Sequence, residues 1–134
     1  MFGEILRESI IQYKSHPFLA FYFLKHFREK FPMIDYKKYT FHLFIHLRLS
    51  SDQQKDWVHT DKSKYSFLTY LSETNYKSGT VLYDKINDDF YPHTEINFKQ
   101  NRALLFKASE YHCSKFNHGD NINNGRLTLN AFLY

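Results

Sequence analysis

The sequence predicts a mainly β fold, a double-stranded β-helix (jelly roll) with two N-terminal helices packed on the sheet. The spacing of apolar residues changes from three or four to two near Tyr39. About eight short strand-like runs then follow, which is the strand number of a jelly roll. Three of the four glycines lie at turns expected between these runs. We therefore expect one domain over residues 1–134, with helices over about 2–31 and a barrel over about 39–134.

Two helices are expected before the barrel. Apolar residues recur at helical spacing over residues 2–13, which favours an amphipathic first helix. Pro17 breaks that pattern, with Ser15 as a suitable N-cap for a second helix. This second apolar helix runs over about Phe18–Phe31 and ends at Pro32.

The first strand of the barrel begins near Tyr39, where apolar residues alternate with a second set, His42, Phe44, His46 and Arg48. We expect the polar members of that set to face solvent rather than substrate. Further strands are expected at Trp57–Thr60, Tyr65–Leu71, Thr80–Tyr83, Glu95–Phe98, Ala103–Lys107, Tyr111–Phe116 and Arg126–Tyr134. Turn residues separate them at Ser78-Gly79, 87–89, Asn101 and 119–125.

Composition limits the classes of function. The net charge of +4 comes from dispersed Lys and Arg residues, which indicates a solvated surface and disfavours a nucleic-acid partner. The single cysteine, Cys113, excludes an internal disulfide and suits a reducing compartment. No run approaches the roughly 18 apolar residues of a membrane span, and Glu4 and Arg7 fall where a signal peptide would be apolar. We expect a soluble cytoplasmic protein, either a monomer or a homodimer.

Three separated residues form the main candidate site. His59 and Asp61 lie two positions apart, so a strand places both on one face, and His112 follows on a distant strand. Two imidazoles and one carboxylate are the facial triad that holds non-haem Fe(II). The similar pairs His118–Asp120 and His93–Glu95 lack a later histidine or enough intervening strands. We therefore take His59, Asp61 and His112 as both the metal-binding and the catalytic residues.

A cation on the last strand suits a co-substrate. Arg126 offers a planar fork for a carboxylate, and Thr128 shares its face of the strand, so a guanidinium and a hydroxyl can meet the same anion. The alternatives without a function are that Arg126 is a surface cation at a strand edge and that His112 is a buried core histidine.

Segments around these residues resemble the Fe(II)/2-oxoglutarate-dependent dioxygenases, in their prolyl 4-hydroxylase-like branch. The segments are Trp57-Val58-His59-Thr60-Asp61, Phe67–Leu71, Ser78–Tyr83, Asn101–Phe106, Tyr111-His112 and Gly125–Leu129. The resemblance implies Fe(II) on the triad, 2-oxoglutarate as co-substrate and ascorbate as an auxiliary reductant. It also implies that Arg126 takes the distal carboxylate of 2-oxoglutarate, with Tyr70 as a hydroxyl partner. The implied activity is hydroxylation with release of succinate and CO2.

The substrate is not defined by these residues. Lysines in the loops expected around the site favour an amino acid, a peptide residue or a small polar metabolite. Phe132 stands where the nucleic-acid demethylases of the superfamily carry a second arginine, which disfavours alkylated bases. Two other classes remain open: a cupin-like metal-dependent enzyme that does not use 2-oxoglutarate, and a non-catalytic jelly-roll binding module.

Overall fold

The computed structural model describes residues 2–5, 10–13, 17–52 and 58–134. Over these residues the chain is mainly β, with one α-helix. The elements in chain order are β1 (Phe2–Ile5), β2 (Ile10–Tyr13), α1 (Pro17–Lys30), the 3₁₀ turn η2 (Tyr36–Lys38), β3 (Phe41–Arg48), β4 (Tyr65–Tyr70), β5 (Asn75–Ile86), β6 (Asp89–Phe98), β7 (Ala103–Lys107), β8 (Tyr111–Ser114) and β9 (Arg126–Leu133).

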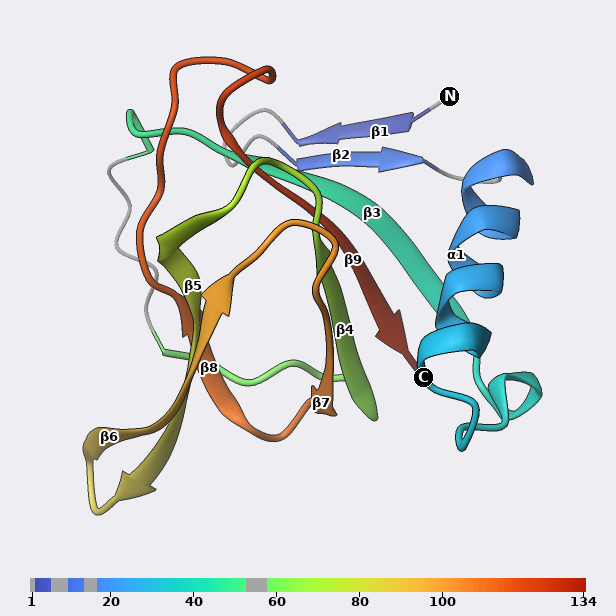
Figure 1. The fold of residues 1–134 in the computed structure, drawn as a ribbon. Coiled ribbons are helices and arrows are strands. Elements are labelled where there is room, and N and C mark those ends of the chain that lie inside the picture. Colours follow the sequence, from blue (N-terminus) through green and yellow to red (C-terminus); the bar gives the residue numbers. More distant parts are fainter. Residues whose placement is uncertain (1, 6–9, 14–16, 53–57) are drawn as a thin grey trace.

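The strands form two antiparallel sheets that lie against each other (Figure 1). The larger sheet has the order β1-β2-β3-β9-β4-β7, and the smaller has the order β6-β5-β8. An isolated bridge between His59 and His112 extends the smaller sheet on its β8 side. Within the described segments the sheets remain open, and no closed barrel of the kind expected from the sequence is formed.

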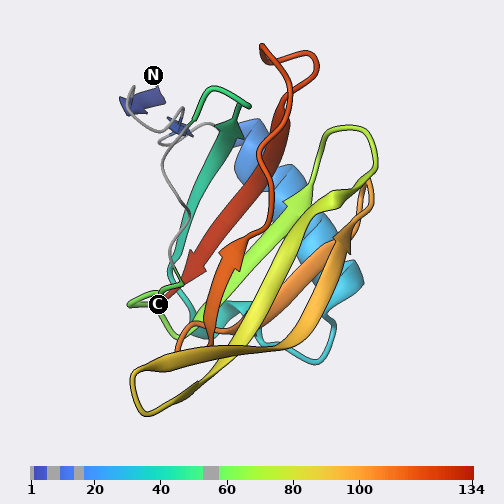
Figure 2. The same cartoon turned by 90° about the vertical axis from the view of Figure 1, so that its left-hand side faces the viewer.

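Alternation along the strands of the larger sheet separates two faces. The outer face packs against α1, whose Phe23 and Phe27 contact Phe67, Ala131 and Leu133 in the main apolar cluster. Figure 2 shows α1 lying behind the larger sheet, with the smaller sheet on the opposite side. Because strand side chains alternate between the two faces, the residues between these core positions point towards the smaller sheet. The candidate site therefore lies between the sheets.

The β5–β6 hairpin explains one error in the predicted turns. Gly79 was expected in a turn, but it lies inside β5 beside a register irregularity. A Cβ there would meet the Ile96 carbonyl oxygen at 1.9 Å, so Gly79 serves a close approach of two strands rather than a turn. The predicted turns at Asn87 and Asn101 are present, and both residues adopt the left-handed conformation that asparagine tolerates, with φ of 57° and 66°.

The prediction of two N-terminal helices is wrong for the first of them. Residues 2–5 and 10–13 are antiparallel strands, and β2 pairs with the edge of β3 through Ile10 and Ile11. The β-branched isoleucines favour strands, and the open edge of β3 supplies backbone partners that an isolated short helix lacks. The expected N-cap, Ser15, lies outside the described residues. None of the helices in the described part of the chain is long and apolar enough to span a membrane.

Candidate metal centre and cavity

Backbone pairing brings two of the predicted ligands together. His59 and His112 are directly opposite each other and exchange both backbone hydrogen bonds, with N–O distances of 3.1 and 2.9 Å. Opposite residues of an antiparallel pair project their side chains to the same face. The two imidazole centroids consequently lie 4.4 Å apart. The strand expected at residues 57–60 is present only as this bridge, and residue 57 lies outside the described residues.

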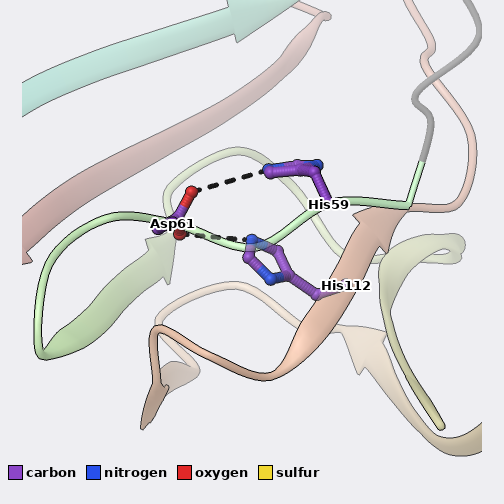
Figure 3. Close-up of side chains that lie close together, drawn as sticks. All are labelled: His59, Asp61 and His112. Atoms are coloured by element: carbon purple, nitrogen blue, oxygen red, sulfur yellow. Dashed lines mark ion pairs between the residues drawn. The ribbon is translucent and has the colours of Figure 1, made fainter. Parts of the chain in front are cut away.

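Asp61 completes the cluster from the segment that precedes β4. Its backbone N–H donates to the Ala108 carbonyl at 2.9 Å. Its carboxylate lies between the histidines, with Oδ1 3.6 Å from His59 Nε2 and Oδ2 3.3 Å from His112 Nε2 (Figure 3). The three ligand atoms lie within 4.8 Å of one another. Cis ligands at metal bonds of 2.0–2.2 Å stand about 3 Å apart, so a small inward movement would place all three on one ion.

Hydrogen bonds prepare the cluster for a cation. The Ser66 hydroxyl donates to Asp61 Oδ2 at 2.5 Å, and His112 Nδ1 donates to the Glu110 carbonyl at 2.8 Å. Because Nδ1 donates to this carbonyl, Nε2, which faces Asp61, is the ring nitrogen that would bind a metal after losing its proton. Burial alone would raise the pKa of Asp61, but hydrogen bonds from His112 and Ser66 and the charges of both imidazoles outweigh it, and the pKa lies below its ordinary value. Asp61 is therefore held as an anion, the form a metal requires.

The cluster opens into a cavity of about 320 Å³ between the two sheets. This volume is at the lower end of the range for small-molecule sites. A larger hollow of about 790 Å³ lies between α1 and η2, but it is lined by none of the cluster residues. The residues around the smaller cavity come mainly from β3 and β9, with others from β4, β5, β8 and the His59 segment: His42, Phe44, His46, Arg48, His59, Asp61, Leu68, Thr80, His112, Cys113, Ser114, Arg126, Thr128, Asn130 and Phe132.

Arg126 lies in the same cavity, towards its other end. It begins β9, six positions before Phe132, and Phe132 is paired with Ser66 beside the metal cluster. Arg126 is only 4% exposed. Its Nε donates to the Ser78 carbonyl at 2.8 Å, and its guanidinium lies over the ring of Phe98 at 5.5 Å. A buried cation with a fixed orientation thus borders the cavity.

The structure distinguishes the two hydroxyl residues that were predicted beside Arg126. Thr128 lines the cavity, and its hydroxyl donates to Asn130 Oδ1 at 2.5 Å. Tyr70 is fully buried behind Arg126, with its ring 5.9 Å from the guanidinium carbon, and it is not among the lining residues. Its hydroxyl shares a 2.7 Å hydrogen bond with Thr80, which does line the cavity. Burial raises the pKa of Tyr70, so this hydroxyl remains neutral.

Sequence reasoning missed the contribution of β3. His46 and Arg48 are partly buried and line the cavity instead of forming the expected solvated face, and Phe44 and the more exposed His42 border the same cavity. The alternation itself was visible in the sequence, but it did not reveal which face would be covered by the smaller sheet. Ser66 was also missed, because nothing in its local sequence distinguishes a serine that meets Asp61 from an ordinary strand serine.

The two similar sequence pairs do not form comparable clusters. Asp120 is exposed in the loop before β9, where its backbone N–H donates to Asn124 Oδ1. Glu95 forms an ion pair with Lys115 on the exposed surface of the smaller sheet. Among the residues that the structure describes, only the group of His59, Asp61 and His112 gathers three such ligand atoms.

Comparison with known proteins gives a likeness of fold. No family model matches the chain, and no curated protein matches it. Among solved structures, the one described as "Crystal structure of IDO from Bacillus thuringiensis" is similar, with a TM-score of 0.53 and 17% sequence identity. The match covers 87% of this chain and 54% of that chain, so this chain spans about half the length of that protein. At this identity the likeness concerns the fold alone.

These results correct the resemblance drawn from the sequence motifs. The motifs suggested the Fe(II)/2-oxoglutarate-dependent dioxygenases and their prolyl 4-hydroxylase-like branch, yet no family model or curated protein supports that membership. Most of the quoted segments are alternating strands and tight turns, which any antiparallel sheet of this kind requires. Their order therefore reflects the arrangement of strands, and the chain is not assigned to that superfamily. The site has to be interpreted from its own geometry.

Proposed function

We propose that this protein is a mononuclear non-haem iron dioxygenase that uses 2-oxoglutarate and hydroxylates an amino acid, a peptide residue or a small polar metabolite. One observation carries the proposal. A cluster of two imidazoles and one carboxylate shares a cavity of about 320 Å³ with the buried cation Arg126. The cluster provides ligands for a metal ion, and the cation provides a binding partner for the distal carboxylate of an anionic co-substrate.

The donor set is compatible with Fe(II). Imidazole and carboxylate ligands that occupy one face and leave the other open are typical of non-haem iron oxygenases. The only cysteine beside the cavity, Cys113, donates from its thiol to the Tyr83 hydroxyl at 3.4 Å. When bound, Fe(II) would allow dioxygen to hydroxylate a substrate C–H bond while 2-oxoglutarate is oxidised to succinate and CO2.

The residues of the chain perform the binding and the positioning. Arg126 would bind the distal carboxylate in a partly dry environment, where a charge-assisted hydrogen bond is stronger than in water. The Ser78 carbonyl fixes the guanidinium in place before the co-substrate arrives. Thr80 adds a hydroxyl from the smaller sheet and Thr128 adds one from the larger sheet. Ser66 holds the Asp61 carboxylate in the orientation that faces both imidazoles.

The strand order agrees with a site of this type. The order β3-β9-β4-β7 faces β6-β5-β8 and the His59 segment, which supports interpretation of the two sheets as a jelly roll with an added β1–β2 hairpin. In that arrangement the cavity between the sheets is the natural place for a small molecule. The cavity volume also favours a small substrate over a nucleobase in a polynucleotide.

The test measures conversion of 2-oxoglutarate to succinate by the purified protein, with Fe(II) under air and with a chelator as the blank. We expect Fe(II)-dependent succinate formation in the native chain and in Asp120→Ala, which alters the similar but unclustered pair. Asp61→Ala should lose this activity. Tight Fe(II) binding without any turnover or binding of 2-oxoglutarate would overturn the proposal in favour of a cupin-like enzyme. Absence of metal binding would favour a binding module.

A further inference from the structure

The β3 wall of the cavity carries chemistry that the proposed co-substrate does not use. His42, Phe44, His46 and Arg48 alternate along β3 and all line the cavity. They are paired in register with Phe132, Asn130, Thr128 and Arg126 on β9, so the two strands present adjacent rows of side chains to the same space. The β9 row includes the proposed anchor for 2-oxoglutarate. The β3 row borders the same cavity but does not include that anchor.

The most informative pair in these rows is Arg48 and Arg126. The two arginines are directly opposite each other on neighbouring strands, and both line the cavity. Like charges in directly opposite positions destabilise a sheet. Arg48 is further oriented by a 3.2 Å hydrogen bond from its Nε to His46 Nε2. Two oriented guanidinium groups on one wall favour the binding of anions there.

The rest of the β3 wall is aromatic. Phe44 and Phe132 pack with their ring centroids 5.3 Å apart, and His42 contacts both rings at 6.0 and 6.3 Å. This group lies near the metal cluster, because Phe132 is paired with Ser66, the residue that donates to Asp61. Arg48 and Phe44 are four positions apart, a distance of about 13 Å along the strand. The wall thus runs from a positive end to an apolar end near the metal.

We infer that the β3 wall binds the prime substrate, and that this substrate is a free carboxylic acid of amino-acid to dipeptide size. Arg48, supported by His46, binds the carboxylate, and the apolar body lies against Phe44 and Phe132 beside the metal cluster. A planar guanidinium fork matches a carboxylate, and the cavity of about 320 Å³ limits the length of the molecule. The inference rests on the proposed function, because it takes 2-oxoglutarate as the molecule bound at Arg126. The test of carboxylate binding at Arg48 does not require turnover of 2-oxoglutarate.

The test compares free L-amino acids and short apolar dipeptides with their C-terminal carboxamides, which lack only the negative charge. Calorimetry on metal-free protein in chelator measures binding of each pair and, separately, binding of 2-oxoglutarate. The best acid should bind about 10- to 100-fold more tightly than its carboxamide. In Arg48→Gln this preference should disappear, while the affinity for 2-oxoglutarate should fall much less than it does in Arg126→Gln. Arg102→Gln is the matched control, because Arg102 donates to the Asn97 carbonyl away from the cavity.

Arg48→Lys keeps the charge without the fork and should retain part of the preference, which guards against misfolding as the cause of loss. Equal binding of acids and carboxamides would overturn the inference, as would a preference that survives in Arg48→Gln. Tighter binding of inorganic phosphate than of any acid would also overturn it. If Arg48→Gln weakens 2-oxoglutarate as strongly as Arg126→Gln does, both arginines serve one anion and the inference is wrong. If acids bind through Arg48 but no succinate forms with Fe(II), the proposed function fails and the subsite stands.

Discussion

The two ends of the cavity are built in different ways. At the metal cluster the side chains come from a short bridged segment and a strand end, and the His59 side chain is 44% exposed, against 14% for Asp61 and 10% for His112. At the other end Arg126 belongs to a central strand of the larger sheet and is 4% exposed. One end thus admits water and a metal ion, whereas the other is dry and preformed.

This difference assigns different physical tasks to the two ends. Partial exposure at His59 permits exchange of a metal, dioxygen and product, while Ser66 and Glu110 fix the less exposed ligands. Burial at Arg126 strengthens its interaction with an anion, because water does not compete for the guanidinium. If the comparison is correct, substitutions at one end should change metal binding and substitutions at the other should change binding of the co-substrate.

The largest effect is expected at the metal cluster. Asp61→Ala removes the only anionic ligand of the cluster, so Fe(II) binding should be abolished in anaerobic titration. Binding of 2-oxoglutarate to the metal-free protein should persist, because Arg126 is untouched. Asp120→Ala is the control and should bind Fe(II) as the native chain does. Undiminished metal content in an Asp61→Ala, His112→Ala double variant would show that another site holds the metal.

The second effect belongs to the arginine end. Charge-assisted hydrogen bonds in a partly dry cavity contribute about 2–4 kcal/mol, so Arg126→Ala should weaken 2-oxoglutarate by roughly 30- to 1,000-fold. Fe(II) affinity should not change. Calorimetry with each ligand separates these effects, and Arg102→Ala provides the control for loss of a half-buried arginine. An unaltered affinity for 2-oxoglutarate would remove either Arg126 or this co-substrate from the proposal.

The limits of some strands could be predicted from the sequence, but the pairing between distant strands could not. β7 (Ala103–Lys107) has the predicted limits, and β9 differs by one residue, because alternation and flanking turn residues define short strands locally. The helix predicted over residues 2–13 is wrong, because β2 pairs with the distant edge of β3 and β1 in turn pairs with β2. The position of Gly79 inside a strand likewise depends on Ile96, which no local pattern reveals.

The same limit applies to the candidate site. The structure brings His59, Asp61 and His112 together. The two-residue spacing of His59 and Asp61 is visible locally, whereas the approach of His112 depends on its backbone bridge to His59. The role of the β3 wall could not be deduced, since the solvent-facing and cavity-facing sides of a strand have the same sequence period. Which side is covered depends on how the smaller sheet packs. Ser66 shows the same problem for a single hydrogen bond.

Ser66 provides a third and smaller test of the metal end. Ser66→Ala removes the hydroxyl that donates to Asp61 while leaving all three metal ligands in place. Loss of such a supporting hydrogen bond lowers metal affinity by about 10- to 100-fold. Ser63→Ala is a suitable control, because the Ser63 hydroxyl donates to the Tyr65 carbonyl instead. Metal affinity in Ser66→Ala equal to that of the control would mean that the Asp61 carboxylate needs no such support.

The smallest effect concerns the stability of the metal-free protein in acid. Burial would raise the pKa of Asp61, but the surrounding hydrogen bonds and imidazole charges lower it below its ordinary value of 3.8. A carboxyl whose folded pKa is depressed stabilises the fold above its unfolded pKa, and this contribution is lost as the pH falls through the folded pKa. The free energy of unfolding of the native chain relative to Asp61→Asn should therefore decrease as the pH falls below about 4.

Urea denaturation in the presence of a chelator measures this difference across the acid range. Ser66→Ala sharpens the test, because it removes one of the hydrogen bonds that lower the pKa of Asp61. The acid-dependent loss of stability, taken relative to Asp61→Asn in the same background, should then be smaller. If the native chain instead gains stability relative to Asp61→Asn as the pH falls below about 4, burial dominates over the hydrogen bonds. The metal end would then resemble the dry arginine end, and the contrast between the two ends of the cavity would not hold.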